Sequence, residues 1–277
     1  MGRVEGKVAF VTGAARGQGR SHAVRLAEEG ADIIAVDLCA EVRGMGYPAA
    51  TPDDLAETVG LVEALDRRIV ATQADVRDYD ALRQALDDGV AQLGRLDIVA
   101  ANAGIGSLAY AAQDISDEIW QDMIDVNLTG VWHTTKAATS HLVSGGRGGA
   151  IVITSSAAGL KGYANIAHYS SAKHGLVGLM RTLAAELGPH NIRVTSIHPT
   201  QVATDMILND STYRLFVPDQ ENPTEDDFRA ASQLMHMLPI PWVESVDISN
   251  ALLFLASDEG RYITAVALPV DAGVTQH

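Results

Sequence analysis

The chain has 277 residues, of which 47% are hydrophobic and 20% are charged, so it can bury one large core. Its formal net charge of −15 repels phosphate backbones and anionic lipids, which argues against nucleic acids and membranes as partners. The single cysteine, Cys39, excludes an intrachain disulfide and a cysteine cluster, and we expect no metal site. The sequence shows no secretion signal and no apolar run long enough to cross a bilayer, so we expect a cytoplasmic protein.

Short runs rich in valine and isoleucine alternate with helical stretches along the whole chain. These runs are apolar throughout, which is typical of strands buried on both faces of a parallel sheet. The predicted strands are 8–12, 32–36, 69–73, 96–100, 150–154, 193–197 and 265–270. The predicted helices are 18–29, 54–66, 79–93, 117–142, 169–187 and 245–256. The alternation predicts an α/β fold, a single doubly wound Rossmann-type domain over residues 1–277 with a seven-stranded parallel sheet.

Two stretches interrupt this alternation. Residues 38–53 form an insertion with several glycines and prolines, and residues from about 200 to 243 mix apolar side chains with prolines. Long excursions from a compact domain are often lids or binding loops, but they can also be tolerated surface loops. Both interpretations stay open for the insertion and for the second stretch, which is a candidate substrate loop.

A glycine-rich turn joins the first predicted strand to a helix. Gly13 permits the tight turn, Gly17 lets the backbone approach a pyrophosphate, and Gly19 lets helix and strand pack closely. The helix begins near Arg16 and Gln18, where free N–H groups and the helix dipole favour a phosphate. Glycine triplets also occur in ordinary turns, but the position in the first β–α turn favours a dinucleotide site.

Asp37 closes the second predicted strand, eighteen residues after Gly19. A carboxylate at this place can accept hydrogen bonds from both ribose hydroxyls of NAD, and it repels the 2′-phosphate of NADP. Arg16 acts in the opposite direction, because a basic residue in the glycine turn can pair with that phosphate. We expect NAD, since Asp37 stands where the strand meets the ribose.

The turns after the third and fourth strands are the next candidates for the cofactor site. Asp75 and Val76 would place a carboxylate and a backbone amide near adenine, although Asp75 can equally cap the following helix. Asn102, Ala103 and Gly104 are small enough for backbone to approach a cofactor closely.

Tyr169 and Lys173 are four residues apart on a predicted helix, so they lie on one face, one turn apart. An ammonium near a phenol lowers the phenol pKa, but this spacing alone also describes a surface cation beside a ring. Ser156 lies just past the fifth strand, at the edge of the sheet where ligands bind, unless it only serves the loop. Asn127 within a predicted helix indicates a kink or a special hydrogen bond, unless it faces solvent.

Taken together, these motifs resemble the short-chain dehydrogenase/reductase family over essentially the whole chain. The matching residues are Thr12, Gly13, Gly17, Gly19, Asp75, Asn102, Ala103, Gly104, Asn127, Ser156, Tyr169 and Lys173. The resemblance implies that Tyr169 is the general acid/base and that Lys173 lowers its pKa and holds the nicotinamide ribose. It also implies that Ser156 orients the substrate oxygen and that Asn127 holds a water that links Lys173 to solvent.

Near the end of the sixth strand the sequence both departs from the family and matches it. The family usually has Pro-Gly where this chain has Pro199-Thr200, so the backbone approach to nicotinamide is expected to differ. Val202 and Thr204 still match positions that contact the carboxamide. His198 and His168 flank candidate sites, and we interpret both as packed or solvated histidines, because no metal-ligand spacing surrounds them.

A closer resemblance is to the mycofactocin-associated dehydrogenases, including those called carveol dehydrogenases. It rests on the insertion 38–53, on the sequence of the glycine turn and on His198-Pro199-Thr200. This resemblance implies a hydrophobic secondary alcohol or ketone as substrate, NAD that does not exchange readily, and mycofactocin as a redox carrier. Two alternatives stay open: a reductase of ketones or 3-oxoacyl groups that exchanges NAD(H) freely, and a dinucleotide-binding regulator without catalysis.

Two hypotheses about larger features follow. Residues 38–53 would form a lid over NAD, because the insertion starts directly after Asp37 and contains apolar side chains that can cover adenine. The helices within 117–142 and 169–187 would form the interfaces of a homotetramer, as the family resemblance implies. Apolar residues beyond one buried face support this assembly, unless they pack only on their own sheet: Leu176, Val177, Leu179, Met180 and Leu183.

Overall fold

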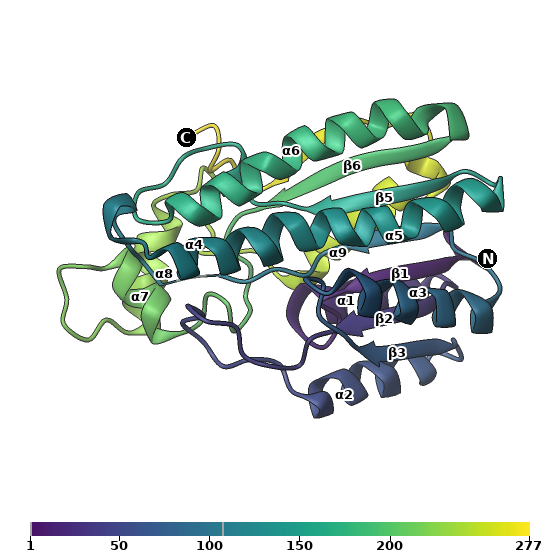
Figure 1. The fold of residues 1–277 in the computed structure, drawn as a ribbon. Coiled ribbons are helices and arrows are strands. Elements are labelled where there is room, and N and C mark those ends of the chain that lie inside the picture. Colours follow the sequence, from purple (N-terminus) through teal and green to yellow (C-terminus); the bar gives the residue numbers. More distant parts are fainter. Residues whose placement is uncertain (1, 107) are drawn as a thin grey trace.

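The computed structural model describes residues 2–106 and 108–277, and seven parallel strands form its one sheet in the order β3-β2-β1-β4-β5-β6-β7 (Figure 1). The strands are β1 (Val8–Thr12), β2 (Asp32–Asp37), β3 (Ile69–Gln73), β4 (Ile98–Ala101), β5 (Gly149–Thr154), β6 (Ile192–Pro199) and β7 (Ala267–Val270). The predicted fold class is therefore confirmed. The strand order reverses between β1 and β4, which creates the crevice where α/β sheets bind ligands.

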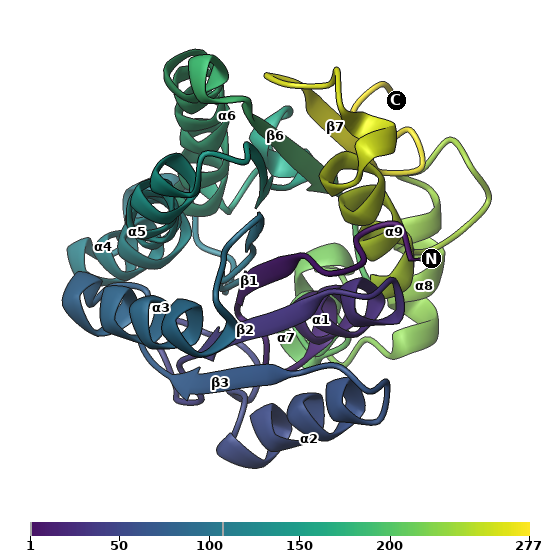
Figure 2. The ribbon, with the colours of Figure 1, turned by 90° about the vertical axis from the view of Figure 1, so that its right-hand side faces the viewer.

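Helices cover both faces of the sheet, and Figure 2 shows the three layers. One face carries α1 (Gly17–Glu28), α2 (Pro52–Glu63) and α9 (Ser245–Ala256). The other carries α3 (Tyr79–Leu93), α4 (Asp117–Ile124), α5 (Gly130–Gly145) and α6 (Ala167–Leu187). Every residue of β1 and β4 is buried as a result, which explains why these runs are apolar throughout.

The single helix expected over 117–142 is in fact interrupted. A π-helical segment, Asp125–Thr129, separates α4 from α5, and Asn127 lies within it. The extra residue in this turn is accommodated because the Asn127 side chain is fully buried and hydrogen-bonded outside the helix. The special hydrogen bond that Asn127 indicates is thus present, although the sequence pattern did not separate the two helices.

The stretch near 200–243 contains two helices that the sequence analysis did not predict, α7 (Asp210–Phe216) and α8 (Glu225–Gln233). Asn209 caps α7, and Thr224 forms a capping box with Asp227 at the start of α8. Phe228 is fully buried, and aromatic rings surround it: Tyr213, Phe216 and Trp242. Both helices lie beyond the carboxyl ends of the strands (Figure 1).

The apolar residues of α6 are largely accounted for by the chain's own core. Leu176, Val177 and Met180 are buried beneath the helix, and Leu179 and Leu183 pack partly against the same cluster. These residues therefore give little support for an interface between copies of the chain. Within residues 2–106 and 108–277, no helix combines the length and the apolar character that crossing a bilayer requires.

The first prediction concerns two fully buried histidines, His22 on α1 and His198 on β6. Burial lowers the pKa of His22 to about 3 and that of His198 to about 4, so both stay neutral in the folded protein at pH 5. In the unfolded chain histidine binds a proton below about pH 6.5, so the unfolded state takes up more protons. The free energy of unfolding should therefore fall as the pH falls from about 6.5 toward 4, by about 1.4 kcal/mol per pH unit for each histidine that stays neutral in the folded protein.

Urea unfolding at pH 7 and pH 4.5 tests this expectation. His22→Leu should reduce the loss of stability between the two pH values, because one of the two imidazoles that must charge on unfolding is gone. An equal loss in His22→Leu and the unchanged protein would contradict the assignment.

Candidate active site

The glycine turn between β1 and α1 has the close packing that the sequence predicts. A Cβ on Gly19 would lie 1.8 Å from the Gly13 carbonyl oxygen, and one on Gly13 would lie 2.9 Å from Ala103 Cα. Gly13 also has φ +70°, a conformation that favours glycine. Only glycines at these positions allow the turn to press against the turn after β4.

Asp37 lies at the carboxyl end of β2, beside the glycine turn. Its Oδ2 accepts a hydrogen bond from Ala15 N and its Oδ1 accepts one from Cys39 N, each at 2.9 Å. The carboxylate is thus fixed in the wall of a cavity of about 450 Å³. Each oxygen keeps lone-pair capacity for a further donor.

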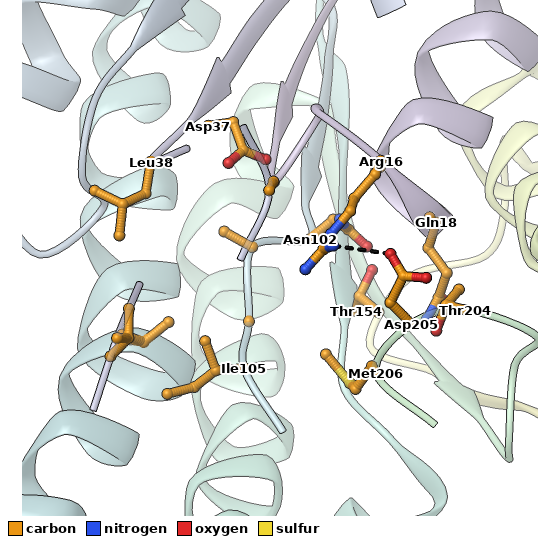
Figure 3. A pocket seen from close by; sticks show the side chains of 18 of the residues that line it. Arg16, Gln18, Asp37, Leu38, Asn102, Ile105, Thr154, Thr204, Asp205 and Met206 are labelled. Carbon is orange, nitrogen blue, oxygen red and sulfur yellow. Dashed lines mark hydrogen bonds and ion pairs between the residues drawn. The ribbon is translucent and has the colours of Figure 1, made fainter. Parts of the chain in front are cut away.

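Arg16 does not stand free to meet a phosphate. Its Nη1 lies 2.8 Å from Asp205 Oδ2, its Nη2 donates to the Pro48 carbonyl, and its guanidinium lies 5.8 Å from the Tyr47 ring centroid. Figure 3 shows the Arg16–Asp205 pair on the opposite side of the cavity from Asp37 and Leu38. The arginine therefore joins the glycine turn, the insertion and the segment after β6.

The turns after β3 and β4 also line this cavity. Asp75 pairs with Arg77 at 2.7 Å, while Asp78, not Asp75, caps the next helix by accepting from Ala81 N. The capping interpretation of Asp75 is therefore wrong. The cavity wall includes these predicted residues: Gly13, Arg16, Gly17, Gln18, Gly19, Asp37, Asp75, Val76, Asn102, Ala103, Gly104, Tyr169, Lys173 and Thr204.

The insertion covers one side of the cavity. Leu38, Ala40, Val42, Met45, Tyr47 and Ala50 all line it. The insertion is held at two further places: Tyr47 Oη accepts from Gly106 N at 3.0 Å, and Ser211 Oγ donates to the Gly46 carbonyl at 3.0 Å. Several residues of the insertion are therefore packed against the cavity, which favours a binding loop over a tolerated surface loop.

Tyr169 and Lys173 lie one turn apart on α6, as expected. Lys173 Nζ donates to the Thr154 carbonyl at 3.1 Å and lies 5.6 Å from the centre of the Tyr169 ring. Burial lowers the pKa of Lys173 to about 8. Burial also raises the pKa of Tyr169, and a hydrogen bond with Ser156 opposes that rise. The lowered tyrosine pKa implied by the family resemblance is thus not found here, because burial outweighs the opposing hydrogen bond.

Ser156 follows β5 in extended backbone, directly before a short 3₁₀ turn, Ala157–Gly159. Its Oγ accepts from Ala158 N at 3.1 Å, and its carbonyl accepts from His198 Nδ1 at 2.8 Å. Ser156 and Val202 line a second cavity of about 400 Å³, which adjoins the first. Residues that line both cavities mark the junction: Gln18, Ser155, Tyr169, Thr204 and Met206.

Asn127 supports the wall of the first cavity from behind. Its Oδ1 accepts from Ile105 N and its Nδ2 donates to the Ile105 carbonyl, both at 2.8 Å. A Cβ on Gly104 would lie 2.8 Å from Asn127 Oδ1 and 3.4 Å from Lys173 Nζ. Asn127 therefore fixes the loop after β4 beside the lysine, and its role with a bound water stays a prediction.

The second cavity is mostly apolar. Its large apolar side chains come from the loop before α6 and from the segment after β6: Tyr163, Ile166, Ile207, Leu215, Phe216 and Met235. Thr200, which replaces the usual family glycine, lines it and places Oγ1 2.7 Å from His236 Nε2. This hydrogen bond joins the end of β6 to the segment that contains His236.

The sequence analysis missed two structural links of the site. The residues of the Arg16–Asp205 pair are 189 positions apart in the sequence, and those of the His198–Ser156 contact are 42 apart. A pattern of neighbouring residues therefore cannot predict either contact. Thr154 was also missed as a candidate. Its buried Oγ1 has no hydrogen-bond partner among the described residues, and it lies in the wall of the first cavity.

Comparison with known proteins gives consistent matches. Residues 7–213 match the family model described as short chain dehydrogenase. The chain is 62% identical over 275 residues to (−)-trans-carveol dehydrogenase of Rhodococcus erythropolis, covering 99% of each chain.

Two solved structures are also similar over the full length of both chains. Carveol dehydrogenase from Mycobacterium avium, solved in complex with NAD, is 64% identical with a TM-score of 0.99. A short chain dehydrogenase from Mycobacterium paratuberculosis, bound to NAD, is 48% identical with a TM-score of 0.91. The expected resemblance to carveol dehydrogenases is confirmed, and the chain belongs to the short chain dehydrogenase family.

Proposed function

We propose that this protein is an NAD-dependent alcohol dehydrogenase that moves hydride between a hydrophobic secondary alcohol and tightly held NAD(H). One observation carries the proposal: Tyr169 stands at the junction of a cavity built from dinucleotide-binding turns and a second, apolar cavity. A proton-transfer residue is needed at the place where cofactor and alcohol meet.

The residues of the first cavity fit a dinucleotide. The glycine turn leaves room for a pyrophosphate at the start of α1, and Asp37 faces the cavity with acceptor capacity for a ribose. Thr154 Oγ1, buried without a partner among the described residues, is a further polar group that a ligand can satisfy. When bound there, NAD supplies the acceptor for the hydride that leaves the carbinol carbon.

The side chains at and near the junction of the two cavities have separate roles in binding the substrate and moving its proton. Ser156 holds the substrate oxygen near Tyr169; the phenolate form of the tyrosine takes the hydroxyl proton during oxidation, and the phenol form returns it during reduction. Lys173 adds a positive charge close to the tyrosine ring, which favours the phenolate as the proton moves. Asn127 keeps the loop beside Lys173 in place through its bonds to Ile105.

The substrate class follows from the second cavity. Its walls are mostly apolar and include Ser156 and Tyr169, an arrangement that suits a hydrophobic alcohol with one reacting oxygen. The similarity to carveol dehydrogenases supports a cyclic alcohol of the size of carveol.

The insertion supports the proposal that NAD is held through many turnovers. The insertion covers the first cavity and is fastened at Arg16, Gly106 and Ser211. A dehydrogenase that keeps its NADH must pass the electrons to a second carrier in place, and we propose mycofactocin as that carrier, as the resemblance described in the sequence implies.

The first test of this function is Tyr169→Phe. The change removes the proton-transfer hydroxyl and little volume, so the turnover number should fall by about 10²–10⁴-fold while bound NAD is retained. Lys173→Met should shift activity to higher pH, because the phenolate loses its nearby cation. Turnover of carveol with an artificial electron acceptor measures both effects, and full activity in Tyr169→Phe would refute the role of the tyrosine.

Cofactor choice is tested by refolding the protein in equal amounts of NAD and NADP and identifying the nucleotide released on denaturation. The unchanged protein should take up NAD, because Asp37 repels a 2′-phosphate and Arg16 is already paired with Asp205. Asp37→Ala should lower the ratio of NAD to NADP that the protein takes up. A preference of the unchanged protein for NADP would overturn the assignment.

The lid is tested by the rate at which bound NAD exchanges with labelled NAD. Replacing residues 40–52 by a few glycines should speed exchange, since a covered ligand leaves slowly. Asp205→Asn should speed it by about two- to fivefold, because it removes one partly exposed ion pair to Arg16. The matched control is Glu225→Gln, which removes an exposed ion pair on α8 and should leave exchange unchanged. Equal exchange rates in all four proteins would contradict the lid.

We also propose that the protein assembles as a homotetramer through α5 and α6, as the family resemblance implies. Trp132 on α5 supports an interface, since its side chain stays 43% exposed in the single chain. Sedimentation at micromolar concentration should give four times the mass of the chain, and Trp132→Glu should lower that mass. A monomer would contradict the assembly.

A further inference from the structure

His198 is a buried histidine at the end of β6, and the cavities described above do not include it. Its side chain has no exposed surface and makes two hydrogen bonds, each 2.8 Å long. Nδ1 contacts the carbonyl oxygen of Ser156, and Nε2 contacts the hydroxyl of Ser196.

These partners fix the proton positions on the ring. A carbonyl oxygen can only accept, so Nδ1 of His198 carries a proton and donates it to Ser156. In the neutral ring Nε2 is then an acceptor, and Ser196 Oγ donates to it. Burial lowers the pKa of His198 to about 4, so the ring keeps this neutral arrangement at working pH.

The bond from His198 completes the anchoring of three consecutive residues, 154–156, which are the last residue of β5 and the two that follow it. Lys173 Nζ donates to the Thr154 carbonyl, and Ser155 Oγ donates to the Lys173 carbonyl at 2.9 Å, so α6 holds the first two. Ser156 is held from β6 by His198, and from its own turn by Gly159 N at 2.8 Å. His198 is thus the side chain from another strand that fixes the backbone of Ser156.

We propose that His198 is a positioning residue for the reaction: by fixing the Ser156 carbonyl, it sets the place of the Ser156 hydroxyl relative to Tyr169. The inference rests on the proposed function, because it assigns a task to the same serine. The backbone that carries a catalytic hydroxyl must be held closely, since a displacement of about 1 Å can cost about 100-fold in rate.

The experiment is a double-mutant cycle between His198 and Ser156. The measured quantity is the single-turnover rate at which bound NAD is reduced by carveol. His198→Leu removes both hydrogen bonds at similar volume and should slow this rate by about 10- to 100-fold. In the Ser156→Ala background the same change should cost less than about twofold, because the hydroxyl that His198 positions is already absent.

A conservative variant and a matched control separate positioning from general damage. His198→Asn keeps an amide donor close to the position of Nδ1 and should recover most of the rate that His198→Leu loses. His141→Leu removes another imidazole, which pairs with Asp87 and lines neither cavity, and should leave the rate unchanged. If His198→Leu does not fold, Ser196→Ala takes its place in the cycle, because it removes the support of Nε2.

The outcomes are distinct. A loss in the unchanged background that vanishes with Ser156→Ala supports the inference. Equal losses in both backgrounds, or no loss at all, would overturn it while the proposed function stands. Full activity of Ser156→Ala would overturn the role of Ser156 and the inference built on it, whereas no reduction of bound NAD by carveol in the unchanged protein would overturn the proposed function.

Discussion

The pairing of β1 with β4 is the feature on which the site depends. The chain returns through the middle of the sheet at this point, and the turns after β1 and β4 meet without a strand between them. Gly13 and Ala103 approach so closely that a Cβ on the glycine would lie 2.9 Å from the alanine Cα. This contact holds the cavity wall in place, and the pairing is possible because helices bury both faces of the strands.

The chemistry is then carried by side chains whose backbones are fixed from two directions. Residues 154–156 leave β5 and are fastened to α6 through Lys173 and to β6 through His198. Burial lowers the lysine pKa and raises the tyrosine pKa, so the charged forms of both are disfavoured in this structure. The hydrogen bond of Ser156 to Tyr169 opposes part of that effect. In this arrangement the hydrogen bonds from α6 and β6 fix the backbone beside the residues to which we assign proton transfer.

Local patterns in the sequence predict the sheet and most of the site, because they depend on residues close together in the chain. Strands buried on both faces leave apolar runs, and Tyr169 and Lys173 share a helix face by spacing alone. The break at Asn127 depends on bonds to Ile105, which no helical pattern contains. Helices α7 and α8 are short, and the prolines near them made the segment look like a loop in the sequence. The link from Arg16 to Asp205 requires the folded chain, so sequence spacing cannot reveal it.

We propose that an alcohol reduces an NAD molecule that the protein already holds, and one measurement tests this directly. Protein freed of loose nucleotide is mixed rapidly with carveol, without any added cofactor or acceptor, and absorbance at the wavelength of NADH is followed. The account predicts a rise that stops at one NADH per nucleotide-containing chain, with the NADH remaining on the protein after gel filtration. No rise without added NAD, together with continuous turnover once free NAD is supplied, would contradict it.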